Sequence, residues 1–458
     1  MNAWETYSQP TIKKVMDFSE GYMNFLSEAK TERLAADRIE QMALAAGYLN
    51  IEEVISKKKK LKAQDKVYIK YMNKSICMMH IGSDPIEEGM NILGAHIDSP
   101  RLDLKQRPLY EDSHIAYFDT HYYGGVKKYQ WVTIPLAIHG VVCLKTGKTV
   151  NISIGEDAQD PVFVISDLLI HLSDAQMKKN AAKVVEGETL NVTVGSIPLK
   201  GEKKDAVKAN MLKLLNQKYG FEEDDFVSAE LEVVPAGPAR SCGLDSSFVL
   251  GYGHDDCVCA YSSLMAQLEA KNVKRSAVTL LVDKEEVGSQ GATGMQSQFF
   301  ETFVAEVMNA LGQYNELSLK RALQNSAMLS SDVCAAHDPN YADVSSPNNN
   351  MPEFGCGITF NKYTGARGKS GCNDANAEYI AQLRAAMDAE KVIWQTGELG
   401  KVDAGGGGTI AYILANYGMR VIDCGVPLHN MHAPHELANK ADIYEAYKGY
   451  KAFLKRMK

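Results

Sequence analysis

The chain has 458 residues, more than one compact core usually holds, so we expect it to fold as two domains. Its hydrophobic content of 45% and charged content of 23% are those of a globular protein and exclude a largely disordered chain. A net charge of -8 argues against a protein that binds nucleic acid, and we interpret the basic run at 57–60 as a solvated turn.

Cysteine usage and hydropathy indicate the compartment in which the protein works. The nine cysteines include no CxxC pair, which is typical of free thiols in a reducing compartment. The N-terminus has no signal-peptide pattern, and no apolar run approaches the roughly 20 residues that a membrane-spanning helix needs. We therefore predict a soluble, cytoplasmic protein with no membrane partner.

The first part of the chain predicts helices, then short strands, then a β-rich region. The first 80 residues contain apolar positions three and four apart, which is typical of amphipathic helices. Residues 66–82 predict a strand hairpin, and the apolar run 90–98 predicts a short buried strand. Residues 115–200 are rich in Val, Ile, Thr and Tyr with intervening glycines, which predicts an antiparallel, β-rich region.

After a helical segment at 205–220, proline and glycine at 233–241 indicate a domain boundary, and strands then alternate with helices. We predict strands at 277–283, 326–333 and 419–425 and helices at 257–271, 295–312, 374–391 and 440–456. This alternation predicts an α/β fold with a mixed, largely parallel sheet sandwiched by helices. Residues 1–99 and 239–458 would form that domain, and residues 100–238 a β-rich insertion.

Polar side chains follow several of the predicted strands. They are His96 and Asp98, Asp255 and Asp256, Glu285 and Glu286, Asp332, and the histidines 429, 432 and 435. Each has an ordinary structural interpretation: the histidine and aspartate at 96 and 98 could be a satisfied polar pair, and Asp256 is better interpreted as a helix cap. Their joint occurrence at strand ends favours convergence at one edge of the sheet.

An oxygen-rich set with two histidines suits two divalent ions that share a carboxylate, and zinc, manganese or cobalt would each be compatible. Two ions could position a water molecule and polarise a carbonyl group. One further carboxylate must stay unligated as a general base. The neighbouring residues Glu285 and Glu286 could supply one ligand and one base.

Five segments in this order resemble the aspartyl aminopeptidase and aminopeptidase I family of di-metal exopeptidases. They are "GAHIDSPRLDLK" at 94–105, "DDCVCAY" at 255–261, "DKEEVGSQGATG" at 283–294, "SSDVCAAHDPNY" at 330–341 and "GGGGTIAYILANYGMRVIDCGVPLHNMHAPHE" at 405–436. The resemblance runs through nearly the whole chain and is weakest in the first 80 residues and within the insertion. It implies a zinc-exopeptidase-like fold for the α/β domain.

The resemblance also implies ligands for two metal ions: Asp255 bridging them, His96 and Asp332 on one ion, and Glu286 and His432 on the other. It implies further that Glu285 is the general base and that Asp98 orients His96.

The resemblance implies an assembly as well. In this family the inserted domain mediates dimer contacts, and dimers build a hollow tetrahedral dodecamer. The segment "DLLIHLSD" at 167–174 resembles the stretch whose histidine reaches the neighbouring subunit's site, so His171 is a candidate substrate-binding residue.

Two stretches depart from the family pattern. Cys257 follows the paired aspartates, either as an inert helix residue, which we favour, or as an adventitious metal ligand. The loop "NKYTGARGKSGCN" at 361–373 carries three cations, Lys362, Arg367 and Lys369. They could form a solvated basic loop, or they could bind an acidic side chain of the substrate.

We therefore expect a metalloaminopeptidase that removes one N-terminal residue, acidic or neutral and leucine-like, from short peptides. An alternative on the same core is a di-zinc deacylase or carboxypeptidase, which would need a cation near the metals for the substrate carboxylate. Another is a non-catalytic shell or cargo-binding protein, which would have no need of Glu285 because that residue is predicted to ligate nothing.

Overall fold

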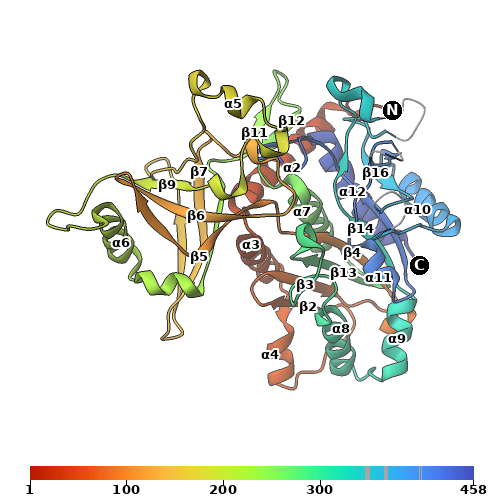
Figure 1. The fold of residues 1–458 in the computed structure, drawn as a ribbon. Coiled ribbons are helices and arrows are strands. Elements are labelled where there is room, and N and C mark those ends of the chain that lie inside the picture. The colour runs from red at the N-terminus through yellow and green to blue at the C-terminus, as the bar shows by residue number, and fades with distance from the viewer. Residues whose placement is uncertain (346–350, 366–369, 402, 404) are drawn as a thin grey trace. The chain divides into compact units, whose positions relative to one another are not determined.

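The computed structural model describes residues 1–345, 351–365, 370–401, 403 and 405–458 (Figure 1). This described chain divides into two compact units. The first comprises Met1–Asp98, Ala239–Met431 and Glu436–Lys458, and the second comprises Ser99–Pro238 and His432–His435.

A mixed sheet forms the centre of the first unit and has nine strands within the described residues. In spatial order they are β1 (Leu49–Asn50), β2 (Lys66–Tyr71), β3 (Ser75–His80), β13 (Ser276–Val282), β4 (Met90–His96), β14 (Ala327–Ser331), β18 (Arg420–Gly425), β16 (Ile358–Asn361) and β17 (Trp394–Thr396). The central strands β13, β4, β14 and β18 are parallel, whereas β2–β3, β3–β13 and β16–β18 are antiparallel pairs. The expected mixed α/β fold is confirmed, with its parallel pairs at the centre.

Helices cover both faces of this sheet (Figure 1). One face packs against α2 (Gln9–Glu28), α3 (Glu32–Ala45), α7 (His254–Glu269), α10 (Ala377–Ala389) and α12 (Lys440–Arg456). The other packs against α4 (Ile51–Ser56), α8 (Phe299–Ala310), α9 (Glu316–Gln324) and α11 (Ala411–Ala415). Neighbouring residues of one strand serve opposite faces: Ile92 of β4 packs with α8 and Leu93 packs with α7, as the period of two requires.

Shorter elements complete the first unit. The one-turn helix α1 (Ala3–Thr6) lies at the N-terminus. A smaller sheet joins five strands of the described chain, namely β11 (Arg240–Cys242), β12 (Phe248–Gly251), β20 (Glu436–Asn439), β19 (Pro427–His429) and β15 (Cys334–Ala335). Strand β12 of this sheet directly precedes α7, in whose first turn two of the predicted site aspartates lie.

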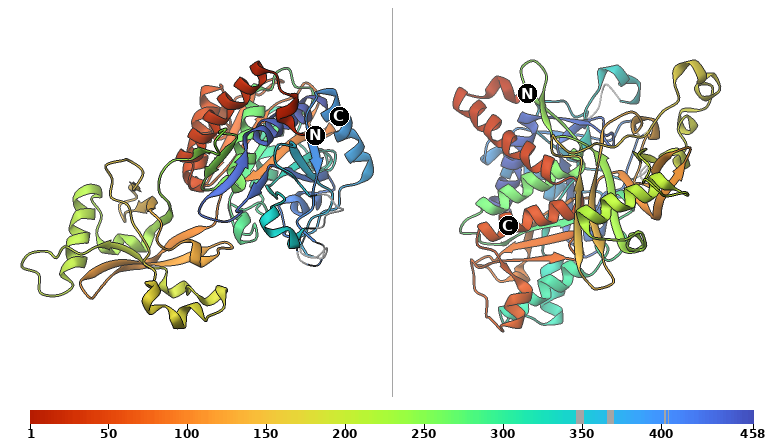
Figure 2. Two further views of the ribbon diagram at one scale, coloured as in Figure 1. Left: turned by 90° about the horizontal axis from the view of Figure 1, so that it is seen from above. Right: turned by 90° about the vertical axis from the view of Figure 1, so that its left-hand side faces the viewer.

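The second unit is built on an antiparallel sheet of six strands, all within described residues. They are β8 (Thr149–Ile154), β7 (Leu136–Cys143), β10 (Ala229–Pro235), β5 (Arg101–Asp112), β6 (Ile115–Tyr123) and β9 (Val192–Gly195). Helix α6 (Ala206–Tyr219) packs against β5, β6 and β9 (Figure 2), and the one-turn helix α5 (Asp174–Met177) lies in the long connection between β8 and β9.

The prediction that 115–200 is β-rich throughout is wrong for residues 155–191. That stretch forms short helical turns with isolated bridges at Phe163 and Val164, rather than strands. Its apolar residues come in short clusters separated by charged and small polar segments such as "DAQMKKN", and this spacing does not sustain the alternation of long strands. Among the described residues, no helix combines the length and apolarity required to cross a membrane.

A buried aspartate fixes the start of α12. The Asp442 carboxylate accepts hydrogen bonds from the backbone N–H groups of Gly355 (2.8 Å) and Gly357 (2.7 Å). Burial raises the pKa of Asp442 from 3.8 to about 8, although both hydrogen bonds act in the opposite direction. The folded chain therefore keeps this proton at pH values where the unfolded chain has lost it.

This shift predicts a pH dependence of stability. A raised folded-state pKa stabilises the protein below pH 4, and that contribution is lost as the pH rises through about 8. Between pH 5 and 8, we expect the wild-type free energy of unfolding to fall relative to Asp442→Asn by on the order of 1 kcal/mol or more. Urea denaturation of both proteins measures this difference, and parallel pH profiles would contradict it.

Candidate metal centre

The C-terminal ends of three neighbouring strands bring polar side chains to one edge of the large sheet. His96 is the last residue of β4, Asp332 follows β14, and Glu285 begins a helical turn (Glu285–Val287) after β13. Parallel strands end at the same edge, so residues distant in the chain meet there. Asp255 joins them from the first turn of α7, which packs against β4.

The His96 ring lies at the centre of this group. Its Nε2 atom is 3.1 Å from Asp255 Oδ1 and 3.9 Å from both Glu285 Oε2 and Asp332 Oδ1. The His96 side chain is 1% exposed, and the side chains of Glu285 and Asp332 are 15% and 14% exposed. Three carboxylates from three separate elements therefore surround one imidazole nitrogen.

These side chains fit a divalent cation. His96, Asp256 and Asp332 each offer a ligand atom within 4.8 Å of the others, and so do His96, Glu285 and Glu286. Carboxylate oxygens with an imidazole nitrogen are a ligand set that zinc, manganese and cobalt accept. No other side-chain type contributes to either group.

The charges of the site reinforce this fit. Burial raises the pKa of Asp332 well above its usual value, and Glu285 raises it further. Burial also raises the pKa of Asp256, with a contribution from Asp255. Burial alone would lower the pKa of His96, but hydrogen bonds with Asp255 and Asp98 raise it well above its ordinary value. The site concentrates negative charge that a cation would neutralise.

Asp98 contacts both sides of the centre. The Nδ1 atom of His96 donates to the backbone carbonyl of Asp98 (2.9 Å) and lies 3.4 Å from its carboxylate. That carboxylate accepts hydrogen bonds from the backbone N–H groups of Glu285 and Glu286, both at 3.2 Å. One residue thus touches the His96 ring and holds the turn that carries the paired glutamates.

The interpretation of Asp256 as a helix cap is wrong. Among the described residues Gly253 precedes α7 as its N-cap, and no hydrogen bond joins the Asp256 carboxylate to a backbone N–H of that helix. The first turn is not helical at Asp255 and Asp256, so their side chains do not follow helical spacing. The buried Asp256 carboxylate instead accepts from the backbone N–H of His96 (3.4 Å).

Two further buried residues hold the start of α7, and no role was predicted for either from the sequence. Glu436 accepts a hydrogen bond from the backbone N–H of Asp255 (3.0 Å). His254 Nδ1 lies 2.7 Å from the Tyr22 hydroxyl, and burial lowers the pKa of His254 to about 3, so its ring is neutral. Glu436 ends the "HNMHAPHE" segment, and its place in that segment was the only indication in the sequence that it lies near the site.

The predicted ligand His432 belongs to the short segment His432–His435, which packs with the second unit. Its Nδ1 donates to the backbone carbonyl of Gly125 (2.9 Å). Donation from Nδ1 places the ring's lone pair on Nε2, which is the arrangement of a metal-binding imidazole. The neighbouring His429 has another role, because its Nε2 donates to the His337 carbonyl (3.0 Å).

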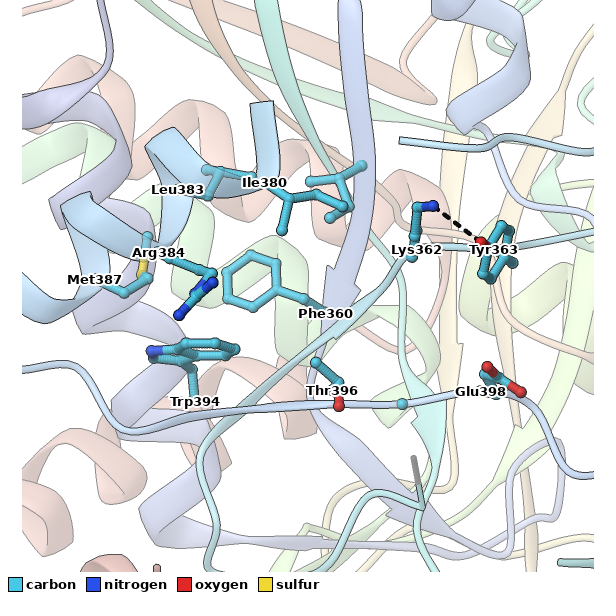
Figure 3. Close-up of a pocket in the computed structure, with 12 residues that line it drawn as sticks. Phe360, Lys362, Tyr363, Ile380, Leu383, Arg384, Met387, Trp394, Thr396 and Glu398 are labelled. Carbon is cyan, nitrogen blue, oxygen red and sulfur yellow. Dashed lines mark hydrogen bonds between the residues drawn. The ribbon is translucent and has the colours of Figure 1, made fainter. Parts of the chain in front are cut away.

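The predicted substrate-binding cations are only partly described. Arg367 and Lys369 lie outside the described residues. Lys362 lines a cavity on the α10 face of the sheet, whose opposite end is bounded by Arg384 and Trp394 (Figure 3). Its Nζ donates to the Tyr363 hydroxyl (2.9 Å) and lies 3.7 Å from Asp374, and neither partner is a candidate metal ligand.

His171 belongs to the second unit, and Cys257 belongs to α7 of the first. His171 is exposed in a helical turn of the second unit (Ile170–Leu172), between apolar side chains that are 69% and 68% exposed. The buried Cys257 thiol donates to the Ala29 carbonyl (3.8 Å), and burial raises its pKa to about 12. A protonated thiol with this partner is consistent with the inert helix residue that we favoured.

Comparison with known proteins relates this centre to a family. The family model described as aminopeptidase I zinc metalloprotease (M18) matches residues 25–454. A probable M18 family aminopeptidase 1 of Clostridium acetobutylicum is 60% identical over 454 residues, covering 99% of this chain and 97% of the relative.

Solved structures agree with this match. The crystal structure of an M18 family aminopeptidase from Thermotoga maritima superposes with a TM-score of 0.94 at 42% identity, covering 100% of this chain and 99% of that one. The S. cerevisiae mApe1 dodecamer shares the fold, with a TM-score of 0.75 at 19% identity over 95% of this chain and 96% of that one. The chain belongs to the M18 family of zinc metalloproteases and is a metal-dependent aminopeptidase.

Proposed function

We propose that this aminopeptidase removes the N-terminal residue from short peptides with the help of two divalent ions per chain, most readily zinc. The observation that carries the proposal is the convergence of Asp255, Glu285 and Asp332 on the Nε2 atom of His96. Bound ions would polarise the scissile carbonyl and acidify an attacking water molecule.

The ligand assignment follows from these contacts and from the family motifs. Asp255 would be the shared ligand, and its Oδ1 atom lies 3.1 Å from His96 Nε2. His96 and Asp332 would hold one ion. Glu286 and His432 would hold the other, and for His432 the support is its motif and the hydrogen bond that orients its ring.

Glu285 is the proposed general base. It takes a proton from the attacking water and gives it to the nitrogen of the departing amine as the peptide C–N bond breaks. The backbone hydrogen bonds from Glu285 and Glu286 to Asp98 hold both glutamates at the edge of the centre. Asp98 is therefore a positioning residue for the His96 ring and for this turn.

The two glutamates can be distinguished by substitution. Glu285→Gln should reduce kcat by at least about a thousandfold while zinc content stays near the wild-type level, because an amide cannot accept the proton. Glu286→Gln should lower zinc content as well as turnover. Elemental analysis beside kinetics on aminoacyl-anilides separates the two effects, and the reverse pattern would show that the roles are exchanged.

The second unit is the proposed oligomerisation domain, and the assembly is a homo-oligomer built from dimers, as in a tetrahedral dodecamer. Support comes from apolar side chains that are widely exposed around His171, among them Leu169, Ile170, Leu172 and Met177. Such a cluster favours burial against another protein surface. The solved mApe1 structure is described as a dodecamer.

This arrangement predicts that His171 acts across an interface. His171→Ala should lower kcat/KM by about tenfold or more while the oligomer measured by light scattering stays unchanged. His121→Ala is a matched control, because His121 is an exposed histidine of the same unit. A fully active wild-type monomer would contradict the prediction, and so would equal losses in the two variants.

The proposed substrates include peptides with an N-terminal Asp or Glu, because Lys362, Arg367 and Lys369 occupy one segment of the chain. Arg367→Ala or Lys369→Ala should lower kcat/KM for Asp- and Glu-anilides by about tenfold and leave Leu-anilide nearly unchanged. Equal losses on all three substrates would refute this preference. N-acetylated anilides should not be cleaved, which distinguishes an aminopeptidase from a deacylase.

A further inference from the structure

Asp423 is a buried carboxylate to which the proposed reaction assigns no role. It lies in β18, where it is paired with Ser330 of β14, and its side chain is 1% exposed. Its neighbour Ile422 lines the cavity on the α10 face, whereas Ile92, Met328 and Val421 form part of the core on the other face. Asp423 therefore points to the face opposite the cavity of Figure 3.

Three hydroxyl groups from separate segments donate to this carboxylate. Thr409 and Ser330 donate to Oδ1 at 2.6 and 3.0 Å, and Thr364 donates to Oδ2 at 3.2 Å. Burial raises the pKa of Asp423 from 3.8 to about 6, and hydrogen bonds from these hydroxyls and from Asn373 act in the opposite direction. Charge-assisted hydrogen bonds of this kind are stronger than neutral ones, so the carboxylate ties the three segments together.

The segments that Asp423 ties together are also hydrogen-bonded to one another. Thr364 also accepts from the backbone N–H of Asn373 (3.2 Å), which joins these two residues. Gly365 donates to the carbonyl of Gly407 (2.9 Å), which links this pair to the glycine run 405–408 that precedes Thr409. Gly406 and Gly408 are exposed, so their backbone offers a polar surface without side chains.

These hydrogen-bonded segments lie next to the strand end that carries a candidate metal ligand. The backbone N–H of Asp332 donates to the carbonyl of Cys424 (3.0 Å), and Cys424 directly follows Asp423. Ser330, one of the three donors, precedes Asp332 by two residues. The carboxylate thus connects the two backbone segments to the edge of the sheet at which the reaction takes place.

We propose that Asp423 is a positioning residue for the peptide substrate: it fixes Thr364–Gly365 and Gly407–Thr409 beside the metal centre so that their backbone can contact a bound peptide. It sets the affinity for substrate and leaves the chemical step unchanged. The inference rests on the proposed aminopeptidase reaction. Thr364 and Thr409 act through Asp423, and Ser330 anchors the carboxylate to β14.

The test removes the donors one at a time. Thr364→Val and Thr409→Val should each raise KM for a dipeptide or an aminoacyl-anilide by about threefold to tenfold, with kcat within about twofold and zinc content unchanged. Asp423→Ala should have a larger effect of the same kind, and Asp423→Asn should recover part of it. Asp442→Asn is the matched control, because it replaces a buried carboxyl group elsewhere in the first unit and should leave KM unchanged.

Unchanged KM in both threonine variants would overturn the proposal, and so would a fall in kcat at constant KM. A second measurement does not depend on activity: amide hydrogen exchange in residues 361–365 and 405–411 should rise at least about tenfold in both threonine variants and not in Asp442→Asn. If the metal-loaded wild type cleaves no anilide, the proposed function fails. The hydrogen-exchange rates of the threonine variants then test by themselves whether Asp423 holds these segments. Exchange at wild-type rates would show that Asp423 does not hold these segments.

Discussion

The structure depends on how buried negative charge is held at the end of β4. Asp255, Glu285 and Asp332 approach one imidazole nitrogen, and burial disfavours the charged form of each carboxylate that it removes from water. Like charges this close would separate unless protons or a cation compensated them. A divalent ion would neutralise this negative charge and would also polarise a bound substrate. The same cluster of carboxylates therefore accounts for the polar edge of the sheet and for the metal dependence of the reaction.

The side chains of such a site must be held in fixed positions. Other acidic side chains make most of the hydrogen bonds that hold the neighbouring segments. Asp98 accepts from the backbone of the turn at Glu285, Glu436 accepts from the backbone of Asp255, and Asp423 accepts from hydroxyls near β14. Each of these carboxylates is buried, and each receives hydrogen bonds that stabilise its charged form. The site is thereby held by backbone and hydroxyl groups that do not compete for a metal ion.

The sequence pattern predicted that polar side chains would meet at one edge of the sheet, because strand-end positions in a parallel sheet are determined by local pattern. His96, Glu285 and Asp332 each follow an apolar run, and adjacent parallel strands end at one edge. It misassigned Asp256, because the first turn of α7 departs from helical geometry and spacing alone cannot show this. It gave no role to Glu436 or Asp423, whose partners lie up to 181 residues away in the chain.

The most direct test of the account is the number of metal ions bound and the residue on which they depend. Equilibrium dialysis against zinc, followed by elemental analysis, should give two ions per wild-type chain and a loss of bound zinc in Asp255→Asn. Asp256→Asn should retain more zinc than Asp255→Asn, because the Asp256 carboxylate already accepts from the backbone of His96. A single ion in the wild type, or zinc lost in Asp256→Asn and kept in Asp255→Asn, would contradict the proposed centre.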